Sequence, residues 1–473
     1  MVRAAVALEE KGFPCVVLVC EGFSGQALDT AEGLGMPNLP LAMEPGHVNL
    51  KNKEELERNT QTVTLGGVIQ GLTVQPSEGK LRPEPNPQDI VFKGTFEDVN
   101  EFFYKNQWQE GMPIVPPTVE KVKEFLKFTD QSPDEVIGVL LPDRRQATVW
   151  NIAVNGVMAG CRPEYMPVLI AILEAMSDPR YGVEHSGNTP GSEELITVSG
   201  PIAKELNFNY TQGVLRVGFQ ANTSIGRFPR LILRNIAGFL PHSTDKGTFG
   251  NTWRVILAEN DEVVRKIDWE PMSVDRGFKA DDDVITIARH HAGASQSSVS
   301  GSADDILDNM ADTLQRMVGI WAADKFTVGI GRGRNGCTEM PHVVITPCIA
   351  EVLAKAGYSR KDVKRALYER AKIPASHIEQ DWKWQMRAPF LLNQTICDLV
   401  KAGKVPKQFC ESSDPNRLIP VVCSPEDIVL TVSGDPLRNN VYTFVSNGAL
   451  GYTTSKRIKL PAKWKQLLNP LRL

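Results

Sequence analysis

Five consecutive residues, Cys161 to Tyr165, bring a thiol, a guanidinium, a carboxylate and a phenol together between two stretches of apolar residues at helical spacing. Pro163 suits the first turn of the second helix, because a proline there gives up an amide that has no intrahelical partner. A thiol at a helix amino terminus beside an arginine has a pKa below its usual value of about 8.5. We therefore expect Cys161 to be a nucleophile and Arg162 to bind substrate; alternatively, Cys161 is a small buried packing residue. Asn155, on a face leading to the same break, either orients a carboxylate or amide substrate or satisfies buried backbone groups.

A second group of polar residues, Asn222, Ser224 and Arg227, enters another helical pattern. Small polar residues followed by glycine and arginine form the kind of helix amino terminus that receives an anion. Pro229 restricts the residue before it and places the helix start at or near that point. An ordinary helix cap explains the same residues equally well. If a carboxylate or phosphate binds this protein, we expect Arg227 and the amides around Ser224 to hold it.

Two adjacent histidines, His290 and His291, open a stretch of small polar residues that ends at Gly301. Adjacent residues of regular structure point to different faces, so we do not expect both to bind one metal ion. One interpretation is a lid over an active site, with one histidine as general base. The other is a solvated loop between domains. The remaining histidines show no metal-ligand spacing, and neither a metal nor another cofactor is predicted.

The segment GRGRNG, residues 331–336, has the glycine spacing of a dinucleotide-binding fingerprint. That fingerprint requires a helix to open within the glycines, whereas the residues that follow read as a strand. We interpret the segment as a turn between strands whose tip displays Arg332, Arg334 and Cys337, which could still be a functional loop.

The composition limits the class of partner. The 473 residues are enough for two or three domains, and 42% hydrophobic with 23% charged residues is typical of a soluble globular protein. A formal net charge of -4 gives no electrostatic reason to expect nucleic acid or an anionic membrane, so a small-molecule substrate is expected. No apolar run reaches the roughly 20 residues of a membrane span, and no signal peptide pattern opens the chain. We expect a cytoplasmic protein whose eight cysteines, which form no CxxC pair, are reduced.

The pattern of elements predicts an α/β fold. Residues 1–80 alternate helix and strand and predict a truncated, doubly wound parallel module, because the apolar run at Cys15 to Cys20 is typical of a strand covered on both faces. Thr62 to Ile69 reads as a short strand. Residues 81–94 form a proline-rich linker, and residues 95–473 form a larger α/β or α+β domain that opens with a capped helix at Thr95.

The first module resembles the UGSC family. The resemblance lies in VRAAVALEEKGFPCVVLVCEGF and ALDTAEGLGMPNLPLAMEPGHV, within residues 2–48. The family is named for a loop with selenocysteine or cysteine, followed by Gly-Ser-Cys, which would stand just before Val2 and is absent from this sequence. Either the chain start is incomplete, or the module is inherited without its nucleophile. The family is distantly similar to the substrate-activating selenoprotein component of glycine and betaine reductases.

The larger domain resembles an uncharacterised family often found beside UGSC proteins. The blocks that carry this resemblance include GMPIVPPT, NIAVNGVMAGCRPEYMPVLIAILEAM, ANTSIGRFPRLILRNIAG and LAENDE. The two resemblances imply a fusion of two subunits that elsewhere act as a pair. They favour an enzyme of thiol-dependent chemistry on a small, carboxylate-bearing substrate, resembling reductive cleavage by glycine or betaine reductase. The alternatives are a cofactor-free lyase or hydrolase, and a non-catalytic subunit that partners a UGSC-type protein or assembles as a homo-oligomer.

Overall fold

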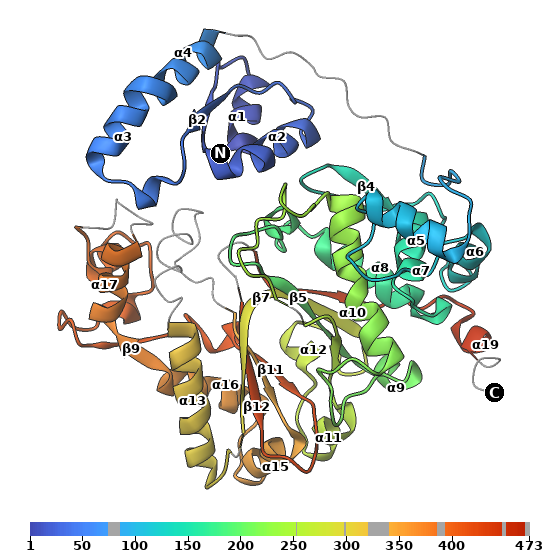
Figure 1. Ribbon diagram of the computed structural model, residues 1–473. Coiled ribbons are helices and arrows are strands. Elements are labelled where there is room, and N and C mark those ends of the chain that lie inside the picture. The colour runs from blue at the N-terminus through green and yellow to red at the C-terminus, as the bar shows by residue number, and fades with distance from the viewer. Residues whose placement is uncertain are drawn as a thin grey trace.

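The computed structural model describes residues 1–73, 86–251, 253–297, 299–319, 340–385, 393–446 and 451–468. Helices and strands alternate around a mixed sheet, so the predicted α/β class is confirmed (Figure 1). None of the helices in these ranges is long and apolar enough to cross a membrane.

Residues 1–73, here called the N-terminal module, contain two parallel strands with helices against them. Their bounds are α1 Val2–Glu9, β1 Val17–Cys20, α2 Ser24–Gly33, β2 Leu41–Glu44, α3 Lys53–Asn59 and α4 Leu65–Thr73. A small apolar core, which includes Val6, Val17 and Ala31, is separate from the cores of the rest of the chain. The order helix, strand, helix, strand is as predicted for this segment.

The strand predicted at Thr62 to Ile69 is wrong, because this stretch is helical: a π-helical turn at Thr60–Thr64 leads into α4. Its glycines allow α4 to lie close to the sheet. A Cβ atom at Gly71 would lie 2.6 Å from a methyl carbon of Val16, and one at Gly67 would lie 3.3 Å from Ala42. The polar, β-branched residues therefore belong to a helix that packs through its glycine face.

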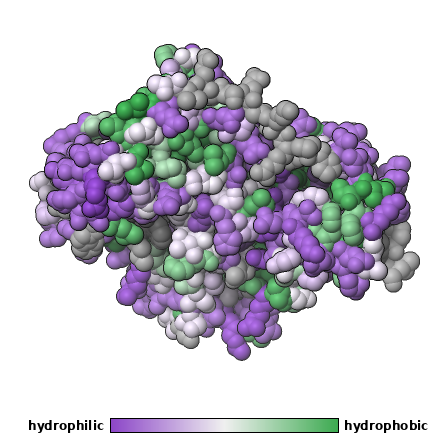
Figure 2. All heavy atoms as spheres, turned by 45° about the horizontal axis from the view of Figure 1, so that its top comes forward, coloured by the Kyte–Doolittle hydropathy of each residue, from purple (hydrophilic) through white to green (hydrophobic). Residues whose placement is uncertain are grey.

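The opposite face of α4 is apolar and exposed. Leu65, Ile69 and Leu72 follow one another at helical spacing and are 50%, 56% and 47% exposed. Figure 2 shows hydrophobic residues gathered over the N-terminal module, at the upper left of the view. We call these three residues the α4 stripe.

The larger domain is built on a seven-stranded mixed sheet. Its strands are β5 Glu193–Ser199, β6 Ile256–Ala258, β7 Val284–Gln296, β8 His342–Ile345, β11 Val429–Val432, β12 Val441–Ser446 and β13 Thr454–Arg457. The order is β11-β8-β12-β7-β5-β6, with β13 paired to the first half of β7. The pairs β5 with β6 and β8 with β11 are parallel, and the others are antiparallel. Two small sheets complete the strands: β3 Val136–Leu140 with β4 Arg145–Thr148, and β9 Lys372–Pro374 with β10 Leu418–Pro420.

The two outer strands of the main sheet, β6 and β11, approach each other where they end. The amide of Asn260 donates to the carbonyl of Val432 at 2.8 Å, and the hydroxyl of Ser433 donates to the carbonyl of Ala258 at 2.7 Å. These bonds satisfy backbone groups that a sheet edge would otherwise leave unpaired, and they fix the loop that follows β6.

Helices cover the sheet on both sides (Figure 1). Their bounds are α5 Phe96–Lys105, α6 Val119–Leu126, α7 Val149–Met158, α8 Met166–Met176, α9 Ile202–Glu205, α10 Gln220–Ile232, α11 Asp261–Lys266, α12 Met272–Asp275, α13 Ala303–Gly319, α15 Pro347–Lys355, α16 Arg360–Arg370, α17 Ala375–Gln385, α18 Ile396–Lys401 and α19 Trp464–Leu468. The predicted capping box of α5 is confirmed, because the Thr95 hydroxyl accepts from the Asp98 amide and the Asp98 carboxylate accepts from the Thr95 amide.

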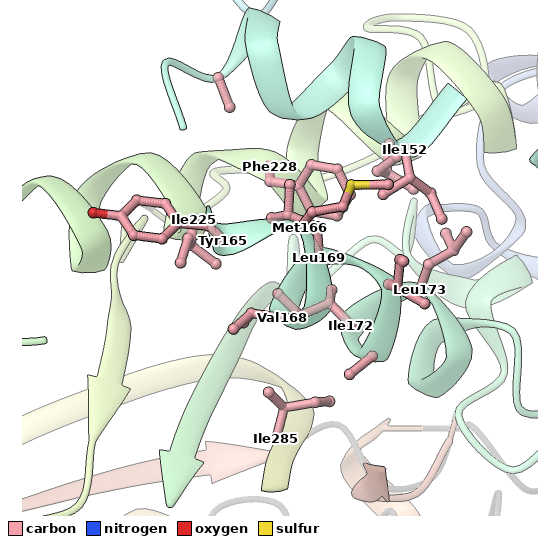
Figure 3. Packing of buried hydrophobic residues seen from close by; sticks show 14 of the residues in the cluster. Ile152, Tyr165, Met166, Val168, Leu169, Ile172, Leu173, Ile225, Phe228 and Ile285 are labelled. Carbon is pink, nitrogen blue, oxygen red and sulfur yellow. The ribbon is translucent and has the colours of Figure 1, made fainter. Parts of the chain in front are cut away.

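The segment from α7 to α8 is the centre of one of the two large apolar cores. Figure 3 shows Ile152 of α7, Met166 and Leu169 of α8 and Phe228 of α10 meeting, all of them fully buried or nearly so. On the other side of α8, Val168 and Ile172 face Ile285 of β7 (Figure 3). The second large core lies between α13, α15 and α16 and strands β8, β11 and β12.

The N-terminal module contacts the larger domain through polar groups. Arg3 lies 3.4 Å from the carboxylate of Glu184, and the side-chain amide of Gln26 donates to the carbonyl of Thr244 at 3.4 Å. The hydroxyl of Ser243 bonds to the carboxylate of Asp29. These contacts leave the α4 stripe uncovered.

Candidate functional site

Cys161 follows the carboxyl end of α7 and does not begin a helix. Gly160 adopts a left-handed conformation with φ of 80°. The amide of Cys161 therefore donates to the carbonyl of Gly156 at 3.0 Å, and the amide of Gly160 donates to the carbonyl of Val157 at 2.9 Å. This pair of bonds is the usual way to end a helix through a left-handed glycine. A short 3-10 turn, Pro163–Tyr165, then precedes α8. The thiol therefore lies at the negative end of the α7 dipole.

The prediction that Cys161 has a lowered pKa is wrong. Burial raises the pKa of the thiol to about 12, while the hydroxyl of Ser224 and the charge of Arg227 act in the opposite direction without overcoming it. The thiolate is the nucleophilic form of cysteine, and this thiol is protonated at neutral pH. Cys161 is among the cysteines that form no disulfide, and it packs against the apolar core of α7 and α8.

Two residues of the second polar group, Asn222 and Arg227, form hydrogen bonds with other parts of the protein. Arg227 bonds to the carboxylate of Glu110, whose side chain is 2% exposed, and to the carbonyl of Met112 at 3.0 Å. Asn222 is fully buried and cross-links the backbone of Asn209 to that of Ile256.

The anion site expected at the start of this helix is not formed. α10 begins at Gln220 and contains Pro229, so Asn222, Ser224 and Arg227 lie inside the helix. The hydroxyl of Ser224 donates to the carbonyl of Gln220 at 2.7 Å. The expectation of Arg227 as a free anion receptor is therefore wrong, because Glu110 already occupies its guanidinium.

Both histidines belong to β7, so the lid and the solvated loop predicted from them are wrong. His290 is fully buried and lies 5.4 Å from the ring of Phe444 and 6.1 Å from that of His342. Burial lowers the pKa of His290 well below its usual value and that of His291 to about 4. His290 is an uncharged core residue at neutral pH, and the periodicity of buried strands explains the apolar run before it.

Three of the thiols predicted to be reduced, Cys397, Cys410 and Cys423, are disulfide-bonded, so that prediction is wrong for them. Cys397 and Cys410 form a disulfide, with Cα atoms 5.1 Å apart. The loop expected to display Arg332, Arg334 and Cys337 lies outside the described residues.

The break between α7 and α8 contributes to a cavity of about 1010 Å³, which we call the strand-end cavity. It opens where β5 and β6 end, because Gly200 directly follows β5 and Glu259 directly follows β6. Parallel strands present their carboxyl ends at one edge of a sheet, and ligands of α/β proteins bind in the crevice outside that edge. The lining comprises Arg162, Glu164, Tyr165, Gly200, Pro201, Ala203, Lys204, Glu205, Leu206, Asn207, Tyr210, Glu259, Asp261, Glu262, Arg265, Asp281 and Leu468.

Three basic and six acidic side chains line the strand-end cavity, and most of them are paired. The ion pairs within the lining are Arg162 with Glu164 at 2.5 Å, Lys204 with Glu262 at 2.6 Å, and Arg265 with Asp281 at 2.8 Å. Glu205 accepts a hydrogen bond from the indole of Trp464 at 2.8 Å, and Glu259 pairs with Arg360 at 2.8 Å. Each base of the lining is therefore matched by an acid.

Asp261 is the exception among these acids. Neither of its buried carboxylate oxygens accepts a hydrogen bond of good geometry in the part of the chain that the structure describes, although the backbone amide of Gly200 is close enough to lower its pKa. Burial raises the pKa of Asp261 to about 7, and the nearby charge of Glu259 adds to the rise, while Arg265 and the backbone amide of Gly200 oppose it. Glu259 itself is held by Arg360, the hydroxyl of Ser199 and the amide of Met272. Two neighbouring carboxyl groups in such different environments are a common arrangement for acid–base chemistry.

Sequence reasoning missed Asp261, although a signal was present. The block LAENDE places acidic residues directly after the short apolar run that forms β6. The position of an acid at the carboxyl end of a parallel strand is informative only once the strand is known, and three residues are too few to identify it by periodicity. Of the residues predicted to bind substrate, Arg162 lines this cavity.

A second and larger cavity, of about 1250 Å³, lies along the outer face of α7, and we call it the α7 cavity. Asn155 lines it, together with Trp150, Val154 and Met158 of the same helix. Its other walls include the connection that precedes α5, the start of α6, residues Arg145 and Gln146 of β4, and residues Arg234 to Ile236 after α10. The structure thus places Asn155 and Arg162 in two different cavities.

The larger domain thus combines a mixed α/β sheet with a cavity at the ends of two of its parallel strands. The model of the UGSC family matches residues 1–73, which supports the resemblance for the N-terminal module. No curated protein and no solved structure matches the chain. The resemblance of the larger domain to a second family remains a prediction.

Proposed function

We propose that the larger domain is an enzyme that moves a proton to or from a small organic substrate in the strand-end cavity, with Asp261 as the acid–base group. The observation that carries this proposal is the buried carboxylate of Asp261, which forms no ion pair among the described residues, in a cavity whose other acids are each held by a base or a hydrogen-bond donor. A general acid or base works best when its pKa lies near the working pH. This supports a lyase or hydrolase that needs no thiol and no added reductant.

The lining charges indicate which group the substrate presents. Because Arg162, Lys204 and Arg265 are each paired with an acid, no basic side chain of the described lining is left unpaired to receive a carboxylate. Among the buried side-chain atoms of the described lining, the acceptors without a hydrogen bond of good geometry are both oxygens of Asp261 and one oxygen of Glu164. Hydroxyl and ammonium groups donate to such oxygens, so a small amine, amino alcohol or polyol is favoured over the carboxylate-bearing substrate expected from sequence.

The geometry favours this proposal over thiol chemistry at Cys161. Neither cavity is lined by Cys161, whereas Asp261 lines one of them directly. Reductive cleavage remains the expectation that follows from the resemblance to the UGSC family. The two proposals differ in a simple way, since reductive cleavage requires a reductant and proton transfer does not.

The test compares Asp261→Asn with the matched control Glu262→Gln. Both residues line the cavity, but Glu262 is exposed and paired with Lys204. The proteins are incubated without reductant with mixtures of small amines, amino alcohols and polyols, and proton NMR follows their conversion. We expect wild type and Glu262→Gln to convert the same compound, and Asp261→Asn to be slower by about 100-fold or more. Full activity in Asp261→Asn, or no conversion by wild type, would contradict the proposal.

Stability against pH provides the folding control for the same variant. The folded-state pKa of Asp261, about 7, exceeds the ordinary value for aspartate, so the folded protein binds more protons than the unfolded chain between about pH 4 and 7. Stability of wild type therefore falls as pH rises through this window. Asparagine does not titrate, so the free energy of unfolding of Asp261→Asn lacks this fall. Measured by urea unfolding, the free energy of unfolding of Asp261→Asn minus that of wild type should be up to about 4 kcal/mol larger at pH 8 than at pH 4.

A second candidate function, partner binding by the N-terminal module, is favoured by the α4 stripe. Exposed apolar patches of this kind mark interaction sites in soluble proteins. The two-stranded sheet of the module also leaves Leu18 on β1 47% exposed. A UGSC-type subunit or a second copy of the chain is the partner proposed for this surface.

A further inference from the structure

The α7 cavity has a continuous apolar wall. Phe92 stacks on Phe102 with ring centroids 4.5 Å apart, and Trp108 meets the edge of Phe103 at 5.4 Å. Of these, Phe92, Phe103 and Trp108 line the cavity, as do Trp150 and Met158 of α7. Figure 2 shows hydrophobic residues gathered on the right of the view, on the side of the molecule where α5 and α6 lie. Such a wall accepts an apolar, ring-containing body.

Three asparagines form a fixed chain on the α7 side of the cavity. The side-chain amide of Asn235 donates to Oδ1 of Asn155 at 2.8 Å, and the side-chain amide of Asn155 donates to the carbonyl of Asn151 at 2.9 Å. Rotating either amide by half a turn would set donor against donor or acceptor against acceptor. The orientation of Asn235 is therefore determined, with its Nδ2 used and its Oδ1 turned to the other side.

Two buried polar groups, on consecutive residues that line this cavity, have no partner among the described residues. They are Oδ1 of Asn235, an acceptor, and the Nε–H of Arg234, a donor. Arg234 uses its Nη1 to donate to the carbonyl of Gln109 at 2.8 Å, which fixes the guanidinium while leaving Nε free. Buried polar groups without partners are rare in proteins, and at the wall of a cavity they indicate groups that a ligand completes.

We propose that the α7 cavity binds a second small molecule, a carboxamide on an apolar, ring-containing body. The carbonyl oxygen of the carboxamide accepts from Nε–H of Arg234, and its N–H donates to Oδ1 of Asn235. A carboxamide carries one hydrogen-bond acceptor and one donor, which match the donor of Arg234 and the acceptor of Asn235. The site is distinct from the strand-end cavity and does not depend on the proton transfer proposed there.

A carboxylate of the same shape fits less well for two reasons. It has no N–H, so Oδ1 of Asn235 stays unpaired and faces a negatively charged oxygen. The surroundings of Arg234 are also balanced in charge, with Glu110 and Asp245 opposed by Arg230 and Arg254. The cavity therefore discriminates by hydrogen-bond pattern more than by charge.

The experiment uses 3-phenylpropanamide and 3-phenylpropanoate as a matched pair of probes. Isothermal titration calorimetry at pH 7.5 measures the affinity of the full-length protein for each. We expect wild type to bind the amide at least about tenfold more tightly than the acid, because the acid leaves a buried acceptor unpaired. Equal affinities, or no binding of either probe at millimolar concentration, would overturn the proposal.

Two variants test the residues named. Asn235→Leu removes the acceptor and should abolish the preference for the amide, while binding of the acid stays within about threefold of wild type. Lys121→Ala, which alters the same cavity but removes neither of the two polar groups, should keep the preference. Retention of the preference in Asn235→Leu would contradict the role of that oxygen. If Asn235→Leu does not fold, as judged by circular dichroism, the comparison of probes in wild type decides.

Discussion

Burial raises the pKa of both Cys161 and Asp261, with opposite consequences for reactivity. Cysteine reacts as the thiolate, so a pKa of about 12 removes its reactivity at neutral pH. A carboxyl group is an efficient proton donor or acceptor when its pKa approaches the working pH, so a value of about 7 creates that ability. Cys161 was proposed as a reactive group from its residue type alone. Asp261 stands out as a candidate only once its surroundings in the folded protein are known.

Alkylation tests the state of Cys161 directly. With iodoacetamide at pH 7.5, we expect Cys161 in the folded protein to react at least about 100-fold more slowly than a free cysteine, because its thiolate fraction is lower. The rate should rise steeply between pH 8 and 10. Mass spectrometry of the labelled peptides gives the rates, with Cys20 and Cys348 as further half-buried thiols for comparison. Rapid labelling at neutral pH would restore Cys161 as a nucleophile.

At the scale of elements, the sequence predicted the regular segments well and the strained or exceptional ones poorly. The strand–helix alternation of residues 1–50 and the capped helix after Thr95 follow from periodicity and capping chemistry. The start of α10 was missed because Pro229 sits inside the helix, where sequence rules do not expect it. β7 was missed because its second half is rich in small polar residues that resemble a loop. In both cases tertiary contacts override local propensity.

The contact between α10 and the loop after α5 gives a prediction at this scale. Arg227 and Glu110 form an ion pair with side chains 14% and 2% exposed. Removing one partner leaves the other charge buried, so Arg227→Met should lower the free energy of unfolding by about 3–5 kcal/mol. The double variant Arg227→Met with Glu110→Met should recover most of this loss, because both charges are gone.

Urea unfolding of the wild type, the single variant and the double variant measures these changes. As a control, Lys127→Met removes one partner of an exposed ion pair with Glu124 and should cost less than about 1 kcal/mol. A double variant no more stable than Arg227→Met would argue against the ion pair as the cause.

At the scale of the whole molecule, the uncovered α4 stripe predicts association. Leu65→Lys combined with Ile69→Lys places two charges on the stripe, and α4 should keep its place because its glycine face is unchanged. We expect the wild-type protein to form a complex with a UGSC-type subunit or with itself in sedimentation velocity runs, and the variant to lose it. Leu437→Lys, at a residue 81% exposed on the larger domain, should behave as wild type. If the wild-type protein stays monomeric both alone and with the UGSC-type subunit, the stripe is not a binding surface.

The site could be predicted from sequence only in part, for a physical reason. Asn155 and Arg162 belong to one continuous segment, and they were identified from it. Their partners in the two cavities, Asn235 and Asp261, come from segments many residues away, and only the folded chain brings them to the walls of these cavities. Without the sheet order, no local pattern distinguishes these residues from ordinary surface amides and acids.

The length of β7 couples the two apolar cores in folding. Its first half pairs with β5 and β13 under α8, and its second half pairs with β12 beside the other core. If either core unfolds alone, the half of β7 beside it loses its neighbouring strands. The backbone groups of that half are then exposed without hydrogen-bond partners, while the other half of β7 still holds them in register. We therefore expect the larger domain to unfold cooperatively, as one unit, despite having two cores.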